Sequence, residues 1–227
     1  MKVPYLVFRG LALTAALMGS VHAYEVGDVI VRAGLTSVSP DESSSNVMVQ
    51  GVGDVGMGAS VNSNTQLGLN AVYMLTNQIG LELLAASPFK HDITLTNTQD
   101  NDLGLGDGKL AQSRQLPPTL SLVYYLPFSG NVQPYLGVGL NYTVFFDEQF
   151  VDSRQDQSFN DLRLDESFAM AAQIGMDYKL NEHWLVNASV RYIDIDTQAR
   201  FEVLGLPAKV SVDVDPWVYS LLLGYKF

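Results

Sequence analysis

The amino-acid sequence predicts an all-β protein: an eight-stranded antiparallel transmembrane β-barrel with long outer loops and short periplasmic turns. Three features indicate this fold. They are the alternating pattern of the last strand, the alternation of long and short connections, and the placement of the acidic residues. Successive side chains of a strand point to opposite faces, so a strand facing lipid carries apolar residues at every second position.

The clearest pattern lies in the last eleven residues, 217–227. One face holds Trp217, Tyr219, Leu221, Leu223, Tyr225 and Phe227, and the other holds Val218, Ser220, Leu222, Gly224 and Lys226. The first face is aromatic at both ends, where Trp and Tyr would meet the two polar boundaries of a bilayer. This segment alone would also fit the last strand of a soluble sandwich. A terminal aromatic residue on the lipid face is typical of outer-membrane barrels, so we expect Tyr225 and Phe227 to form the assembly signal.

Seven further segments alternate in the same way. The predicted strands are 29–36, 67–75, 79–86, 119–126, 135–144, 168–178, 184–192 and 217–227. The connections are long at 40–64, 87–115, 147–165 and 194–215, and short at 76–78, 127–133 and 179–183. The long ones read as polar loops, with a weak pattern for a helical turn in 147–165 and a projecting hairpin in 194–215. This asymmetry and the even strand count place both termini on the periplasmic side.

The acidic residues avoid the predicted membrane-facing surface. All but five of the 24 lie in the long connections or beside them, the others being Glu25, Asp28, Glu82, Asp177 and Glu182. None of these falls on the predicted lipid face, where a charge near the midplane would cost roughly 2–4 kcal/mol. A soluble sandwich would instead have a polar outward face and comparable loops at both ends. The distribution therefore favours the membrane barrel.

The first residues predict export. Lys2 and Arg9 precede the short apolar run 11–18 and the small residues around Ala23, which is the pattern of a secretory signal peptide. We therefore assign residues 1–23 to a signal peptide and 24–227 to the barrel domain. No segment is long and apolar enough for a transmembrane helix. The chain has no cysteine, so its stability depends on hydrogen bonding and burial, and its net charge of −11 argues against nucleic acid as a partner.

Several segments together resemble the OmpW family of small outer-membrane barrels. They are 64–69 (NTQLGL), 79–86 (IGLELLAA) with Pro88 and Phe89, 116–120 (LPPTL), 134–143 (PYLGVGLNYT) with 145–147 (FFD), 184–187 (WLVN), 194–196 (DID) and 215–217 (DPW). They follow the family's order and span nearly the whole of 24–227. The resemblance implies a monomeric eight-stranded barrel with a narrow, largely apolar lumen, associated with uptake of small, often hydrophobic molecules. Segment 40–64 diverges, and the substrate itself is not implied.

The sequence contains few residues that could form a catalytic site. Of the three histidines, His22 belongs to the signal peptide, while His91 and His183 fall at opposite ends of the predicted barrel. We therefore expect no catalytic residues, no metal and no cofactor, although a lipid-modifying enzyme remains a third hypothesis. The aspartate pairs near the last long connection could hold a calcium ion or could simply be solvated; they are Asp194 with Asp196, and Asp213 with Asp215.

The inward face predicts the properties of the lumen. Many of its residues are small, which leaves space or serves barrel curvature. Its apolar members include Val72, Met74 and Leu84, and its charged members are Arg32, Glu82, Asp177, Arg191 and Lys226. Unpaired buried charges are costly, so we expect at least one carboxylate–guanidinium contact among the charged set. We expect a narrow lumen, apolar above and constricted by this charge cluster below; a packed polar plug without passage is the alternative.

Pro117 and Pro118 are the sharpest local feature. Proline cannot donate a hydrogen bond to a neighbouring strand, so pairing between the third and fourth strands should fail at their outer end. The interruption could frame a lateral opening, or it could be a rigid loop end above the bilayer.

The function we expect is passive uptake of small, mainly hydrophobic molecules across the outer membrane, with lateral release into the membrane as one route. The alternative is a closed structural or interaction barrel whose acidic loops bind lipopolysaccharide or external ligands. The expected partners are outer-membrane lipids and lipopolysaccharide, small apolar solutes and the barrel-insertion machinery.

Overall fold

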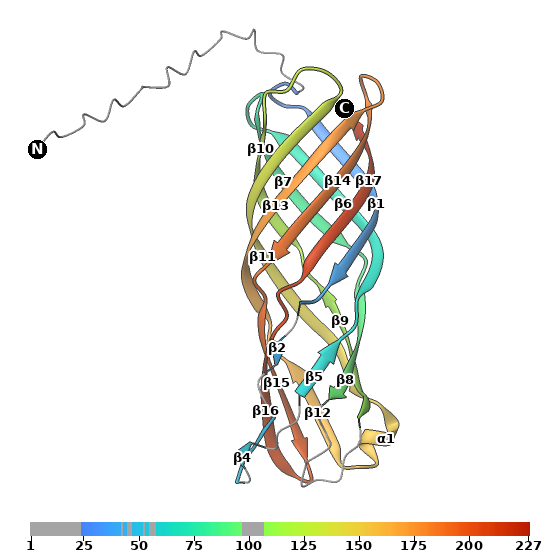
Figure 1. Ribbon diagram of the computed structural model, residues 1–227, viewed down its shortest axis with the longest axis vertical. Helices are drawn as coiled ribbons and strands as arrows, with labels where there is room; N and C mark the ends of the chain where they lie inside the picture. The colour runs from blue at the N-terminus through green and yellow to red at the C-terminus, as the bar shows by residue number, and fades with distance from the viewer. Residues whose placement is uncertain (1–23, 42, 45–46, 52, 55–57, 97–106) are drawn as a thin grey trace, which may run out of the picture.

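The computed structural model describes residues 24–41, 43–44, 47–51, 53–54, 58–96 and 107–227. It forms a tall barrel with the C-terminus at one end and the short helix α1 (Asp152–Gln155) at the other (Figure 1). Within this part of the chain, no helix is long and apolar enough to cross a membrane. The predicted signal peptide, 1–23, lies outside the described residues.

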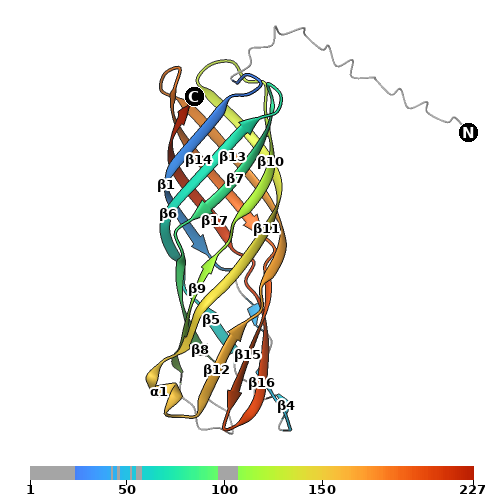
Figure 2. The same cartoon turned by 180° about the vertical axis from the view of Figure 1, so that it is seen from behind.

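Eight strands form a closed antiparallel barrel, which confirms the predicted fold class. They are β1 (Val29–Ser39), β6 (Asn64–Met74), β7 (Ile79–Ala86), β10 (Thr119–Tyr125), β11 (Val132–Phe150), β13 (Ser167–Lys179), β14 (Trp184–Ile193) and β17 (Trp217–Lys226). Their order is β10-β7-β6-β1-β17-β14-β13-β11, and β10 pairs with β11 to close the barrel. Each predicted strand corresponds to one of these. The short connections all lie at the end that holds the C-terminus, which we call the terminal end (Figures 1 and 2).

The two faces of each barrel strand differ as the alternation predicts. On β17, Leu221 is 60% exposed, whereas its neighbour Leu222 is 2% exposed. Aromatic pairs border the apolar band at both ends: the rings of Trp184 and Tyr225 are 5.1 Å apart at the terminal end, and those of Tyr192 and Trp217 are 5.3 Å apart at the other. The outer face of the barrel is therefore an apolar belt that is bordered at each end by aromatic residues.

The long connections are not polar loops, and this part of the prediction was wrong for 87–115 and in part for 40–64 and 147–165. They fold into β2 (Ser43–Ser44), β3 (Met48–Val49), β4 (Gly53–Asp54), β5 (Gly58–Val61), β8 (Phe89–Thr96), β9 (Gly108–Leu116), β12 (Phe159–Leu164), β15 (Asp196–Val203) and β16 (Leu206–Asp213). The helical turn in 147–165 and the hairpin in 194–215 are confirmed by α1 and by β15–β16. Apolar residues at alternate positions, such as Phe89 and Leu95, can be buried on one face of a strand, which explains the difference.

These strands continue the barrel wall beyond the belt, as Figure 2 shows. Strand β11 extends to Phe150, six residues past its predicted end, and pairs there with β9, which in turn pairs with β8. On the other side, β12 pairs with β15 and β15 with β16. We call this part, made of β5, β8, β9, β12, β15, β16 and the end of β11, the outer extension. Its interior is lined by a large apolar cluster that includes Phe150, Phe159 and Phe201.

Candidate functional site

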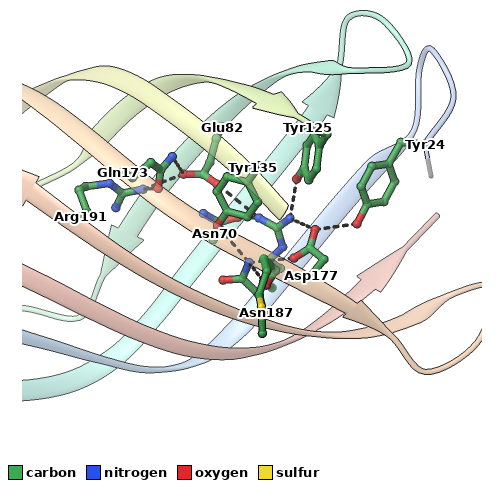
Figure 3. A network of polar contacts seen from close by, with 11 residues as sticks. Tyr24, Asn70, Glu82, Tyr125, Tyr135, Gln173, Asp177, Asn187 and Arg191 are labelled. Carbon is green, nitrogen blue, oxygen red and sulfur yellow. Dashed lines mark hydrogen bonds and ion pairs between the residues drawn. The ribbon is translucent and has the colours of Figure 1, made fainter. Parts of the chain in front are cut away.

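Four charged side chains meet in the interior of the barrel, each at an inward position of its strand. Arg32 on β1 lies 3.3 Å from Glu82 on β7 and 2.5 Å from Asp177 on β13. Arg191 on β14 lies 2.7 Å from the second oxygen of Glu82. All four are nearly or completely buried. The expected carboxylate–guanidinium contacts are therefore present, and we call this cluster the charged layer (Figure 3).

Neutral side chains complete the hydrogen bonding of the charged layer. Arg32 also donates to the side-chain oxygens of Asn70 and Tyr125, at 3.0 and 2.7 Å. Gln173 joins Arg191 to Glu82, and Asn187 donates to Asp177 at 2.8 Å. Two guanidinium groups balance two carboxylates, so the layer carries no net charge. A buried ion pair is tolerated when its geometry is good and its remaining polar atoms are satisfied, and this layer largely meets both conditions.

An aromatic and aliphatic layer closes the terminal end of the lumen. The rings of Tyr24 and Tyr125 are 4.7 Å apart, and those of Tyr125 and Tyr135 are 5.2 Å apart. The hydroxyl of Tyr24 donates to Asp177 at 2.6 Å, which ties this layer to the charged layer (Figure 3). The other buried members of the layer are Ile30, Val72, Met74, Val123 and Leu185.

Three predicted inward residues, Val72, Met74 and Lys226, lie elsewhere than expected. Val72 and Met74 are buried, but they belong to the layer at the terminal end and do not line an apolar space above the charges. The reason is the direction of β6, which runs toward the terminal end and places its last inward residues there. Leu84 is buried one inward position beyond Glu82. Lys226 lies away from the charged layer and pairs at 3.4 Å with Asp28 near the terminal rim.

The apolar space lies in the outer extension, beyond the charged layer. It is a narrow cavity of about 70 Å³ with almost purely apolar walls. Its lining includes Leu110, Ala111, Phe145, Phe150, Leu162, Leu164, Ala199, Phe201, Val210 and Val212. Cavity residues in 87–115 and 147–165 were not predicted, because both segments read as polar loops. The available signal was an apolar residue at most alternate positions, as in Phe89, Ile93 and Leu95.

His91 and Gln115 bring polar atoms to the wall of this cavity. The Nδ1 atom of His91 lies 2.7 Å from the backbone oxygen of Asn62, and its Nε2 atom lies 3.0 Å from the side-chain nitrogen of Gln115. A carbonyl only accepts, so Nδ1 carries the hydrogen and Nε2 accepts from the amide. Burial lowers the pKa of His91 below its ordinary value. The imidazole is therefore neutral at physiological pH.

The ladder between neighbouring strands is interrupted beside this cavity. Strands β7 and β10 pair as far as Leu84 and Thr119, and pairing resumes between β8 and β9 at Phe89 and Gln115. Pro88 lies on one side of the interruption, with Pro117 and Pro118 on the other. We call the interruption the proline seam. Pairing thus fails at the prolines, as predicted, but the outer extension closes the wall again beyond them.

The two adjacent prolines differ in their backbone contacts. The backbone N–H of Tyr142 on β11 donates to the oxygen of Pro118 at 3.1 Å, so the polar groups of Pro118 face β11. Pro117 and Pro118 lie between β9 and β10, outside both strands, and the oxygen of Pro117 accepts from the hydroxyl of Thr119 at 3.2 Å. The side chain of Asn141, which the sequence did not single out, donates from the interior to both proline oxygens at 3.1 and 3.2 Å.

The remaining candidate positions lie outside this interior. Asp196 and Asp213 are cross-strand partners, and burial followed by repulsion from Asp213 raises the pKa of Asp196. No group of three or more metal-ligating side chains was found among the described residues. Phe227 is 69% exposed on the outward face, and its ring lies 4.8 Å from that of Tyr225. His183 stacks on Tyr225 at the terminal end, far along the barrel from His91.

Comparisons with known proteins agree with this architecture. The sequence model of the OmpW family matches residues 25–227. Outer membrane protein W of Vibrio cholerae is 43% identical over 221 residues, which cover 96% of this chain and 97% of that protein. The crystal structure of the outer membrane protein OprG from Pseudomonas aeruginosa is 46% identical, with a TM-score of 0.83, and the match covers 90% of this chain and 97% of OprG.

A more distant relative is the dibenzothiophene metabolism operon protein PahQ of Pseudomonas aeruginosa. It is 28% identical over 196 residues, which cover 86% of this chain and 87% of PahQ. Together with the family match and the closed eight-stranded barrel, these relatives give the chain its family and its location. The chain belongs to the OmpW family of outer-membrane β-barrel proteins of Gram-negative bacteria.

Proposed function

We propose that this barrel takes up small, mainly hydrophobic molecules passively, through the outer extension and out sideways at the proline seam. The observation that carries the proposal is the order of layers along the lumen. An apolar cavity lies toward the outer end, and beneath it the charged layer and the aromatic and aliphatic layer fill the barrel. In this proposal Arg32, Glu82, Asp177 and Arg191 form the constriction that stops an apolar solute.

The energetics favour a sideways exit over passage through the charged layer. An apolar molecule that crossed the layer would have to separate buried ion pairs, and breaking one such pair costs about 3–5 kcal/mol. It would offer the freed charges no hydrogen bonds in return. Transfer of the molecule into the adjacent bilayer is instead favourable, by a free energy of about 0.8 kcal/mol for each CH₂ group removed from water.

The proline seam supports an exit at the level of the cavity. Gln115 lines the cavity and is also the first residue that pairs beyond the seam, opposite Phe89. The cavity therefore borders the interruption. Its volume of about 70 Å³ is roughly half that of an engineered 150 Å³ cavity that admits benzene. A ring compound would pass only if lining side chains or the seam moved apart.

The chemical class of the solute is supported by the lining and by a relative. The cavity walls are almost wholly apolar. The name of PahQ places that protein in an operon for the metabolism of dibenzothiophene, which is an apolar aromatic compound. We therefore propose apolar aromatic and aliphatic molecules as the substrate class of this chain. We also propose that the chain functions as a monomer.

Uptake into liposomes tests the proposal. The wild-type barrel should accelerate entry of naphthalene and octane, trapped by an internal hydrophobic acceptor, but not of glucose. Ala199→Leu adds bulk to the cavity wall and should lower this rate severalfold, whereas Ala71→Leu adds the same bulk on the lipid-facing side of β6 and should not. Equal rates for empty liposomes and the wild type would overturn the channel and favour a closed interaction barrel. Turnover of a lipid substrate would instead indicate an enzyme.

A further inference from the structure

The outward surface of the outer extension carries a polar hollow that the transport proposal does not use. It is lined by Lys90 on β8, Gln112, Ser113 and Arg114 on β9, and Asp147 and Gln149 on β11, and it has a volume of about 210 Å³. We propose that this hollow binds the phosphate of a lipid headgroup in the outer leaflet. Lipid binding at this hollow does not depend on the proposed transport function.

The charges in the hollow favour an anion. Lys90 and Arg114 are direct cross-strand partners, and like charges directly opposite each other destabilise a sheet unless a counter-charge joins them. Arg114 lies 3.1 Å from Asp147, but both side chains are at least half exposed, so this contact contributes little. Among the described residues, no acidic side chain lies within ion-pair distance of Lys90. One excess positive charge therefore remains in the hollow.

A neighbouring cation shows the contrast. Lys109, on the same hairpin, pairs with Asp92 at 2.9 Å. Among the described cations of the β8–β9 hairpin, Lys109 and Arg114 each have a carboxylate partner, and Lys90 has none within ion-pair distance. The charge of a phosphate, with its three acceptor oxygens, would complement Lys90 and Arg114 together, and Gln112 and Gln149 could donate from the same walls.

The height of the hollow matches the headgroup region. On β11, the outward Tyr142 marks the edge of the apolar belt, because its ring is exposed while its hydroxyl contacts the carboxylate of Glu166. Arg114 pairs with Phe146, four residues further along β11. With about 3.3 Å of rise per residue and a strand tilt of 35–45°, that is roughly 10 Å above the belt edge. Flexible Lys and Arg side chains can reach back from there to the headgroups.

The surface just below the hollow suits the rest of a lipid. Leu116 and Val144 are cross-strand partners that point outward and lie between the hollow and the belt. A ligand held here would place its phosphate against Lys90 and Arg114 and its acyl chains along apolar side chains. A soluble phosphate would gain only the first of these contacts, so the observations favour a lipid over a free anion.

Binding of lipid A to the full barrel in phosphatidylcholine nanodiscs tests the proposal. We expect native mass spectrometry to detect bound lipid A, with Lys90→Gln and Arg114→Gln each weakening it about fivefold. Asp147→Asn removes the competing carboxylate and should strengthen binding. Lys209→Gln, which removes a cation from another surface of the outer extension, is the matched control and should change nothing.

Two probes identify the source of the phosphate. Lipid A without its two phosphates should bind equally weakly to the wild type and to the Lys90→Gln, Arg114→Gln double variant, because it has no phosphate for the two cations to contact. Inorganic phosphate at equal concentration should not displace lipid A. Three results would each overturn the assignment. They are full displacement of lipid A by inorganic phosphate, binding of the dephosphorylated lipid to the wild type as tightly as lipid A, and weaker binding of lipid A to Asp147→Asn. Folding of every variant is checked by its heat-dependent gel mobility.

Discussion

Arg32 and Asp177 lie 2.5 Å apart in the buried interior of the barrel, although 145 residues separate them in the sequence. Their strands are not neighbours, because β17 and β14 lie between β1 and β13 in the barrel order. The contact therefore spans the lumen. It joins two walls of the barrel directly. Through Glu82 on β7, Arg32 is also linked to Arg191 on β14, so the contacts connect four strands.

Removal of Arg32 should destabilise the barrel strongly. Arg32→Met leaves Asp177 buried without its cation, and we expect a loss of about 3–5 kcal/mol in the free energy of unfolding. Urea unfolding in lipid vesicles, followed through Trp184 and Trp217, measures it. The double variant Arg32→Met, Asp177→Asn keeps the Glu82–Arg191 pair and restores neutrality, so it should be more stable than Arg32→Met alone. If the losses in the free energy of unfolding of Arg32→Met and Asp177→Asn simply added up in the double variant, the idea of a charge-balanced layer would be contradicted.

The proline seam predicts different effects for two adjacent substitutions. Pro117→Thr restores a backbone donor next to the seam, and a hydrogen bond from it to β7 or β8 would hold the wall closed. We expect uptake of apolar solutes to fall severalfold while the folded fraction is kept. Pro118→Thr introduces its N–H toward β11 and serves as the control, with uptake near the wild-type rate. Unchanged uptake in a folded Pro117→Thr variant would make passage through the lumen the better account.

Assembly should depend on the last residue. Phe227 is exposed on the outward face, whereas Lys226 lies on the inward side of β17 and contacts Asp28. If the terminal aromatic residue is read by the insertion machinery, deletion of Phe227 should reduce folded protein in the outer membrane far more than Lys226→Ala does. Quantitative immunoblots of heated and unheated membrane fractions compare the two. Similar amounts of both folded variants would argue against the assembly signal.

Acidification should loosen the hairpin β8–β9 through His91. Burial keeps the pKa of His91 below the ordinary value of about 6.5, even though the carbonyl of Asn62 and the charge of Asp92 oppose the shift. The folded state then binds fewer protons than the unfolded state, so stability is full above about pH 6.5 and declines as the pH falls below it. Hydrogen exchange of β8 and β9 should accelerate between pH 7 and 5.

A titration and a variant check this assignment. The imidazole of His91 should titrate below pH 6.5 in NMR spectra of the folded barrel. His91→Gln should remove most of the pH dependence of exchange in β8 and β9, and His183→Gln, at the terminal end, should retain it. A wild-type barrel whose exchange in this hairpin is the same at both pH values, after correction for intrinsic rates, would contradict the prediction.

Local patterns in the sequence determined the barrel. The alternation in segments such as 217–227 specifies which residues face lipid and which face the lumen, because the side-chain period of a strand is fixed at two. Inward placement of Arg32, Glu82, Asp177 and Arg191 follows from the same period, and their pairing follows from the cost of a lone buried charge. These conclusions need only one strand at a time and a general electrostatic rule.

Only the tertiary structure decided where the lumen is open and where it is closed. The depth of Val72 and Met74 depends on strand direction and register, which pairing between distant segments sets. Segments 87–96 and 108–116 bury their alternate apolar residues only because β11 extends far enough to pair with β9. The cavity, the proline seam and the hollow beside Lys90 arise from such long-range pairing. Their residues come from strands far apart in the chain, so no local pattern could assemble them.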